Sequence, residues 1–183
     1  MARDTLSRSL HDLGLSAWFG GTLANAVALN DAAGKAGDDS AAGRVANTGW
    51  DAWTPVNAVA IGAHLVGDVG QIIGNKGRIA GQRGVGSMSI VKTGLTAAAL
   101  GATAYSRVLG RQVSEQTDVP VGDATNPSFQ TPEKVAKAQR QLKVLQWVVP
   151  ALTGALVVVS AFAGEQQRSS EVSKGLLGKV TGR

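Results

Sequence analysis

The stretch Thr54–Gly74, TPVNAVAIGAHLVGDVGQIIG, decides the fold, because it is long and apolar enough to cross a bilayer and yet carries four polar side chains. On a helix with 100° per residue these side chains fall within roughly 60° of arc. We call them the polar stripe: Asn57, His64, Asp68 and Gln71. A polar group stranded in hydrocarbon is costly, so the stripe has to face a helical bundle or a wet cavity.

Small residues lie beside the polar stripe, and they predict a face on which another helix packs closely. The residues expected to make this contact are Ala63, Gly67, Gly70 and Gly74. The opposite face is aliphatic and suits lipid. Gly70 and Gly74 also form a GxxxG pattern, but the chain has 24 glycines, so self-association is an alternative that the pattern alone leaves open.

Three further apolar segments predict an all-α fold, a four-helix transmembrane bundle in a single domain. The expected spans are 13–29, 54–74, 88–109 and 144–164, with a long outer loop 110–143 between helices 3 and 4 and a cytoplasmic tail 165–183. Asn30–Asp51 is predicted to be a polar linker. Thr54 followed by Pro55 predicts the start of the second helix, and Thr131–Glu133 predicts another helix start.

The first span has a competing interpretation as a cleaved signal peptide. Two arginines precede an apolar segment that contains Ala24-Asn25-Ala26, an Ala-x-Ala pattern typical of a cleavage site. The apolar segments downstream favour a retained span. Cleavage would leave three spans instead of four.

Lys and Arg set the expected orientation of the spans. With the N-terminus in the cytoplasm, ten of the 18 Lys and Arg residues fall in cytoplasmic segments. The basic loop after Gly74 contributes most to this asymmetry. The sequence therefore predicts a multi-pass plasma-membrane protein with both termini in the cytoplasm. Lys92 and Arg107 lie near the two ends of the third span, where long side chains can snorkel towards water.

The charge and cysteine content exclude some classes of protein. A net charge of +5 invites a nucleic-acid interpretation, but the basic residues lie beside apolar segments and no binding motif is present. The expected partner is the lipid bilayer, with other membrane protein subunits or self-association, and no nucleic acid. Zero cysteines exclude a disulfide framework and thiol chemistry.

The polar stripe has a structural and a functional interpretation. In the structural one, its members bond to neighbouring helices and fix their rotation. The polar residues expected to meet them are Asn25, Thr96, Thr103, Gln139, Gln146, Thr153 and Ser160. In the functional one, His64 and Asp68, four residues apart on one helix, form a proton relay or a cation site.

Signatures of enzymes and cofactors are missing from the sequence. There is no Walker loop, no HExxH and no GxSxG motif, so no catalytic, cofactor-binding or metal-binding residue is predicted. Haem held between two histidines would need His11 and His64 to face each other. His11 precedes the expected first span, and at 1.5 Å per residue the two depths differ by roughly 15 Å. The sequence therefore predicts no cofactor.

Several stretches resemble a known group of proteins as wholes. They are SLHDLGLSAWFGG (9–21), WTPVNAVAIGAHLVG (53–67), TAYSRVLG (103–110) and KVAKAQRQLKVLQW (134–147). The chain resembles small multispanning membrane proteins of actinobacteria, a group with no assigned activity. The resemblance implies a plasma-membrane location and an actinobacterial setting, and it brings no catalytic or ligand residue.

Two functions follow as expectations. The first is a non-enzymatic four-span membrane protein that serves as an accessory or scaffold subunit, with its small-residue faces and outer loop binding a larger membrane complex. The alternative is a small proton- or cation-linked carrier, channel or sensor centred on His64 and Asp68. The sequence leaves the partner, the ligand and the oligomeric state open.

Overall fold

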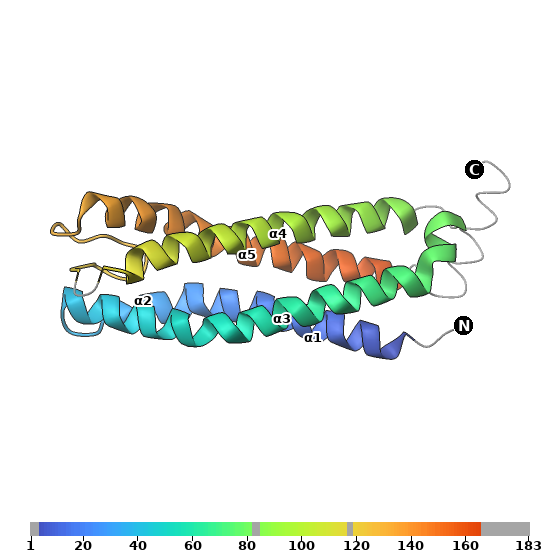
Figure 1. Ribbon diagram of the computed structural model, residues 1–183, viewed down its shortest axis with the longest axis horizontal. Helices are drawn as coiled ribbons and strands as arrows, with labels where there is room; N and C mark the ends of the chain where they lie inside the picture. Colours follow the sequence, from blue (N-terminus) through green and yellow to red (C-terminus); the bar gives the residue numbers. More distant parts are fainter. Residues whose placement is uncertain (1–3, 82–84, 117–118, 166–183) are drawn as a thin grey trace.

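The computed structural model describes residues 4–81, 85–116 and 119–165, and these residues form an antiparallel bundle of four long helical arms (Figure 1). Its elements are α1 (Thr5–Ala24), the π-helical segment η1 (Asn25–Leu29), α2 (Asn30–Ala33), α3 (Asp39–Gly81), α4 (Val85–Ser114) and α5 (Glu133–Glu165). Within these ranges there is no β-strand, only an isolated bridge between Val121 and Pro127. The prediction of an all-α fold is confirmed.

The helices alternate in direction, so the start of α1 and the end of α5 lie at the same end of the bundle (Figure 1). The opposite end, which we call the loop end, carries α2 and the connection between α4 and α5. The connection runs from the end of α4 at Ser114 to the start of α5 at Glu133, so it is shorter than the predicted loop 110–143. The predicted helix start at Thr131–Glu133 coincides with the start of α5. Residues 166–183 of the predicted tail lie outside the described part of the chain.

Helix α3 begins well before the predicted start at Thr54, so that prediction is wrong. The chain turns at Gly37, which has φ 103°, and the Asp38 carboxylate accepts a hydrogen bond from the Ala41 N–H at 2.7 Å. This is the geometry of an N-cap. Pro55 lies inside the helix at an exposed position. The helix continues past it, and the Thr54 hydroxyl donates to the Trp50 carbonyl at 2.8 Å.

The predicted polar linker 30–51 is therefore helical over most of its length. Its alanines are good helix formers, and Ala33, Ala42 and Ala46 are buried against the loop end of the bundle. Helix α3 has 43 residues, which is about 65 Å at 1.5 Å per residue. A bilayer core is about 30 Å thick, so this helix reaches well beyond one.

Two helices are long and apolar enough to cross a membrane, α3 over Asp39–Gly77 and α5 over Glu133–Glu165. Among the described residues, α1 and α4 do not meet the same test. This supports membrane association in a coarse sense and leaves the four-span arrangement as a prediction.

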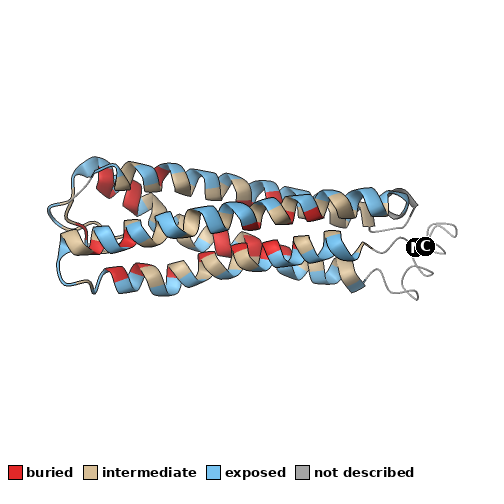
Figure 2. Ribbon diagram, turned by 60° about the horizontal axis from the view of Figure 1, so that its bottom comes forward, coloured by how far each residue is buried: buried red, intermediate tan, exposed pale blue. Residues whose placement is uncertain are grey.

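The bundle has polar side chains inside and many apolar ones outside. Figure 2 shows the buried residues on the inward faces of the helices and long exposed stretches on their outward faces. The buried polar residues are His11, Thr22, Asn30, His64, Thr96, Thr125, Gln139 and Thr153. Exposed aliphatic and aromatic residues on α3, α4 and α5 include Val59, Val66, Ile73, Ile90, Val158 and Phe162.

Candidate functional site

Helices α1 and α3 touch backbone to backbone, and this contact positions the candidate site. A Cβ atom at Gly14 would lie 2.5 Å from the His64 backbone nitrogen, and one at Gly67 would lie 2.5 Å from the Ser7 carbonyl oxygen. Only glycine fits at so short a separation. The contact brings the first turns of α1 against the middle of α3 and seats His11 on His64.

Three of the four residues expected on the packing face lie against α1 or the residue just before it. Gly67 contacts the backbone of Ser7 and His11, Gly70 faces the Ser7 side chain, and Gly74 faces the Asp4 carboxylate. Ala63 is half-buried. The close partner of this face is therefore a helix of the same chain.

Four ionisable side chains from α1, α3 and α4 meet at this contact, and we call them the ionisable centre: His11, His64, Asp68 and Lys92. The ring centroids of His11 and His64 are 4.5 Å apart. Asp68 Oδ1 lies 3.0 Å from Lys92 Nζ and 3.8 Å from His11 Nε2. Both histidines are buried, and the side chains of Asp68 and Lys92 are only 14% and 12% exposed.

The two histidines differ in their hydrogen bonds. His11 Nδ1 lies 2.7 Å from Asp12 Oδ1, and the Asp12 side chain is 59% exposed. Neither ring nitrogen of His64 has a hydrogen-bond partner among the described residues, and His11 Nε2 has none either. Buried imidazole nitrogens normally find a partner, so this centre has hydrogen-bonding capacity that its own side chains do not use.

Two sequence-based expectations about these residues are wrong. The depth difference of roughly 15 Å between His11 and His64 assumed that the first helix starts near Leu13 and that both spans run straight and in register. Helix α1 starts at Thr5 and crosses α3 at the glycine contact, so the rings are neighbours. The two rings touch each other, so a haem could bind between them only if they moved apart.

Lys92 was expected to snorkel towards water, but its ammonium group pairs with Asp68 inside the bundle. The physical reason is that α4 runs antiparallel to α3, which places Lys92 opposite a carboxylate that would otherwise be buried alone. At the other end of α4, Arg107 Nη1 donates to Asp51 Oδ1 at 3.1 Å, and this pair is 34% and 57% exposed.

The polar stripe divides between two regions of the bundle. His64 and Asp68 belong to the ionisable centre, whereas Asn57 lines a pocket nearer the loop end. Gln71 is half-buried, and its side-chain nitrogen has no partner among the described residues. The residues expected to bond to the stripe have other environments. Trp18 Nε1 donates to Thr103 at 3.2 Å, Asn30 to Gln146 at 2.7 Å, and Gln139 to the Asp123 carbonyl at 2.9 Å.

The remaining expected partners make no bond to the stripe either. Thr153 donates to carbonyls of its own helix. Asn25 Nδ2, Thr96 Oγ1 and Ser160 Oγ are buried without a partner among the residues that the structure describes. The stripe is therefore not a set of interhelical cross-links of the expected kind.

A layer of apolar side chains separates the ionisable centre from the pocket. It consists of Leu15, Trp18, Ala99 and Leu156, with Ile61 and Leu100 packed against it. Trp18 is fully buried, and its indole ring lies 6.0 Å from the His64 ring. Thr103, which accepts the bond from Trp18, lines the pocket beyond. The layer therefore contacts both regions.

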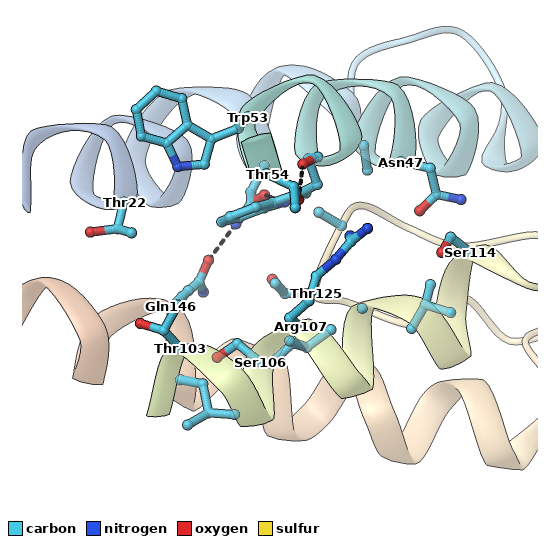
Figure 3. A pocket seen from close by; sticks show the side chains of 18 of the residues that line it. Thr22, Asn47, Trp53, Thr54, Thr103, Ser106, Arg107, Ser114, Thr125 and Gln146 are labelled. Carbon is cyan, nitrogen blue, oxygen red and sulfur yellow. Dashed lines mark hydrogen bonds between the residues drawn. The ribbon is translucent and has the colours of Figure 1, made fainter. Parts of the chain in front are cut away.

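The pocket has a volume of about 330 Å³ and lies between α3, α4, α5 and residues 121–125 of the connection before α5. Apolar side chains make up much of its wall, and a ring of polar side chains interrupts them. Figure 3 shows Arg107 reaching from α4 into the space between the helices, with Trp53 and Thr54 on the opposite side. Part of the wall comes from residues that the sequence assigned to a linker, including Asn47 and Trp50.

Sequence reasoning missed His11 and Lys92 as members of the site. His11, Gly14 and Trp18 lie at i, i+3 and i+7, which places them on one helical face. That spacing was the available signal for His11. No sequence signal identified Lys92, because its partner depends on how α4 packs against α3. Among the described residues no group of three or more His, Cys, Asp or Glu has an arrangement that could hold a metal ion.

The chain was compared with protein-family models, with curated proteins and with solved structures, and none of the three comparisons gives a match.

Proposed function

We propose that the protein is a small membrane protein that takes up and releases a proton inside its helical bundle, as part of a proton-linked carrier or sensor. The observation that carries the proposal is the environment of His64. This side chain is fully buried on the ring of His11, and neither of its nitrogens has a partner among the described residues. An imidazole that only fixed the packing would be expected to use at least one of them.

The inverted distribution of polarity supports a membrane location. Soluble monomers rarely expose large contiguous apolar surfaces, yet Val59, Val66, Val69 and Ile73 are exposed along α3. The ionisable side chains lie inside instead, which is where they are found in membrane proteins that move protons or ions. The four-span arrangement and the plasma membrane are part of this proposal, as is the cytoplasmic location of both termini.

The chemistry of the proposed centre is a relay. Asp12 is exposed and contacts His11, and the other ring nitrogen of His11 lies 3.8 Å from Asp68, whose carboxylate pairs with Lys92. An imidazole can accept a proton on one nitrogen and release one from the other. In the proposed mechanism His11, His64 and Asp68 share the proton, and Asp12 contacts the Nδ1 atom of His11. Lys92 supplies a positive charge that adjusts how readily this happens.

The apolar layer limits how far a proton can go. Leu15, Trp18 and Leu156 carry no group that forms a relay, and they lie between the ionisable centre and the pocket. Transport across the whole bundle would need a second arrangement in which this layer opens, as alternating access requires.

The accessory-subunit hypothesis has less support from the geometry. It relied on small-residue faces and a long outer loop as binding surfaces for a larger complex. Gly67 and Gly70 face α1 of the same chain and Gly74 faces Asp4 just before it, and the helices α4 and α5 extend to Ser114 and from Glu133 into the predicted loop. An Asp68→Asn protein that assembles normally but takes up fewer protons would favour the relay over the accessory-subunit hypothesis.

The test uses the two histidines of the chain, which are its only ones. Nitrogen NMR of ¹⁵N-histidine-labelled protein in micelles gives two ring systems, and His64→Gln assigns them. We expect the titrations of the two rings to be coupled, and Asp68→Asn to shift both because it removes a negative charge but keeps the shape. Asp51→Asn, an exposed acid on the same helix, is the matched control and should leave both titrations unchanged.

Proton uptake is measured on the same variants in weakly buffered micelles with a pH-sensitive dye. After an acid pH jump, wild type should bind more protons per chain than His64→Gln and Asp68→Asn, and both variants should keep normal helicity. Two histidines that fail to titrate across the pH range in which the protein stays folded would overturn the proposal.

Topology is tested separately, because the spans are predicted from segment lengths and basic loops. Reporter fusions after Gly81 and at the C-terminus should report the cytoplasm, and a fusion after Asp123 should report the exterior. A cytoplasmic signal at Asp123 contradicts the four-span arrangement. N-terminal sequencing of the mature protein decides whether the first span is cleaved near Ala26.

A further inference from the structure

We propose that the pocket at the loop end is a binding site for an uncharged amphiphile that carries free hydroxyl groups, of the monoacylglycerol class. The inference is independent of the proton-linked function. The pocket volume of about 330 Å³ lies at the lower end of the range for ligand pockets, about 300 to 1,000 Å³. Ile61, Leu100 and Leu145 give it an apolar wall that suits a hydrocarbon chain.

Hydrogen-bonding groups in the wall point to the polar part of the ligand. Four buried atoms that belong to pocket-lining residues have no partner among the described residues: Trp53 Nε1, Asn57 Oδ1, Arg107 Nε and Gln139 Oε1. They come from α3, α4 and α5. Buried polar atoms left unpaired are rare in native proteins, because each loses its bonds to water without replacement.

Two of these atoms are donors and two are acceptors. The indole N–H of Trp53 and the guanidinium N–H of Arg107 can only donate. Gln139 is fully buried, and its amide donates to the Asp123 carbonyl, so its oxygen is the group left over. A hydroxyl group both donates and accepts, and a ligand with two hydroxyls can therefore serve donors and acceptors in one orientation.

The charges around the pocket favour an uncharged ligand. Arg107 already pairs with Asp51. The Asp123 carboxylate accepts bonds from the N–H groups of Thr125 and Asn126 and from both of their side chains. Since the three charged side chains in the wall are all engaged, a charged headgroup would displace an existing bond to gain a new one.

The pocket has an opening that suits entry from a bilayer. Ala58 and Ala104 line the pocket and are also exposed, so the opening lies between α3 and α4. Their small side chains leave the passage clear. Ala58 belongs to the aliphatic face of α3 that suits lipid, so a chain dissolved in the membrane would reach the pocket sideways.

The experiment measures binding of radiolabelled monoolein to the purified full chain in detergent micelles. We expect saturable binding that unlabelled monoolein displaces. Methyl oleate, which has the same chain and no hydroxyl, should compete at least tenfold less well, and oleate should do the same because of its charge. Equal competition by methyl oleate, or the absence of saturable binding, would overturn the proposal.

Variants place the binding in the pocket. Trp53→Phe removes the unpaired indole N–H, and Asn57→Leu removes the amide with its unpaired oxygen; each should weaken monoolein binding about three- to tenfold. Trp147→Phe, an exposed tryptophan on α5 that does not line the pocket, is the matched control and should bind like wild type. Unchanged affinity in both pocket variants, with normal helicity by circular dichroism, contradicts the assignment.

A third variant tests the opening. Ala104→Trp should block entry and reduce binding at least tenfold without changing the folded core, because the native side chain is exposed. His64→Gln should keep wild-type affinity for monoolein. A failure of the relay experiments therefore leaves this proposal standing, and the reverse also holds.

Discussion

The ionisable centre and the pocket lie on either side of one apolar layer, and they differ in how closely the helices approach each other. At the centre, Gly14 and Gly67 let the backbones of α1 and α3 touch, so polar side chains meet one another. At the pocket, the Trp53 indole lies over Gly21 and fills the space between the same two helices. There the polar side chains of three helices face a cavity of about 330 Å³.

The difference shows that the residues of one polar stripe can lie in two different environments. Asp68 is matched by Lys92 because α4 lies against it, whereas Asn57 is left with an unpaired oxygen in the pocket wall. Where the helices pack closely, their polar side chains pair with one another. Where the helices lie farther apart, the polar side chains face a cavity and can bind a ligand. Three substitution pairs test this contrast, and the first two take one residue from each region.

The largest difference is expected between the two ion pairs. Lys92→Met leaves Asp68 almost buried without its partner and should lower the free energy of unfolding by about 3 kcal/mol. Arg107→Met breaks a pair that is 34% and 57% exposed and should cost less than about 1 kcal/mol. Denaturant titration in micelles measures both. The double variant Lys92→Met with Asp68→Leu should recover most of the loss, and equal costs for the two single variants would remove the contrast.

Glycine substitutions should give the next largest effect. In Gly67→Ala the new methyl group meets the backbone of Ser7 and His11, neither of which can move aside cheaply, so the free energy of unfolding should fall by about 2 kcal/mol. Gly110 lines the pocket, and a Cβ there would meet nothing within 4 Å. Gly110→Ala should change stability by less than about 0.5 kcal/mol. Thermal unfolding followed by circular dichroism compares them, and a destabilised Gly110→Ala protein would show that the pocket is packed more tightly than described.

The smallest effect concerns the bond between the apolar layer and the pocket. Thr103→Val keeps the shape of the side chain but removes the acceptor for Trp18 Nε1, so it should cost about 1 kcal/mol. Thr93→Val, at an exposed position on the same helix, is the control and should be close to neutral. Tryptophan fluorescence should also shift in Thr103→Val, because the indole N–H loses its partner. An unchanged spectrum would mean that this bond does not persist in solution.

The sequence by itself determined the helical fold and the grouping of its polar residues. Apolar segments of sufficient length predict helices, and the 3.6-residue period places His64 and Asp68 on one face of α3 whatever surrounds it. The helix start at Thr131–Glu133 was also predictable, because it depends on a few neighbouring residues. The same local reasoning failed at Thr54, where the cap formed by Asp38 starts the helix earlier and a single exposed proline does not end it.

Only the tertiary structure decided what the polar stripe meets. His11 reaches His64 because two glycines far apart in the sequence, Gly14 and Gly67, meet where α1 crosses α3. Lys92 turns inward because antiparallel packing places it opposite Asp68, although its position near a helix end suggested contact with water. Periodicity is a property of one helix and can be read locally. The partner of a buried side chain depends on the distance and register between helices, and these follow from contacts between residues that are remote in the chain.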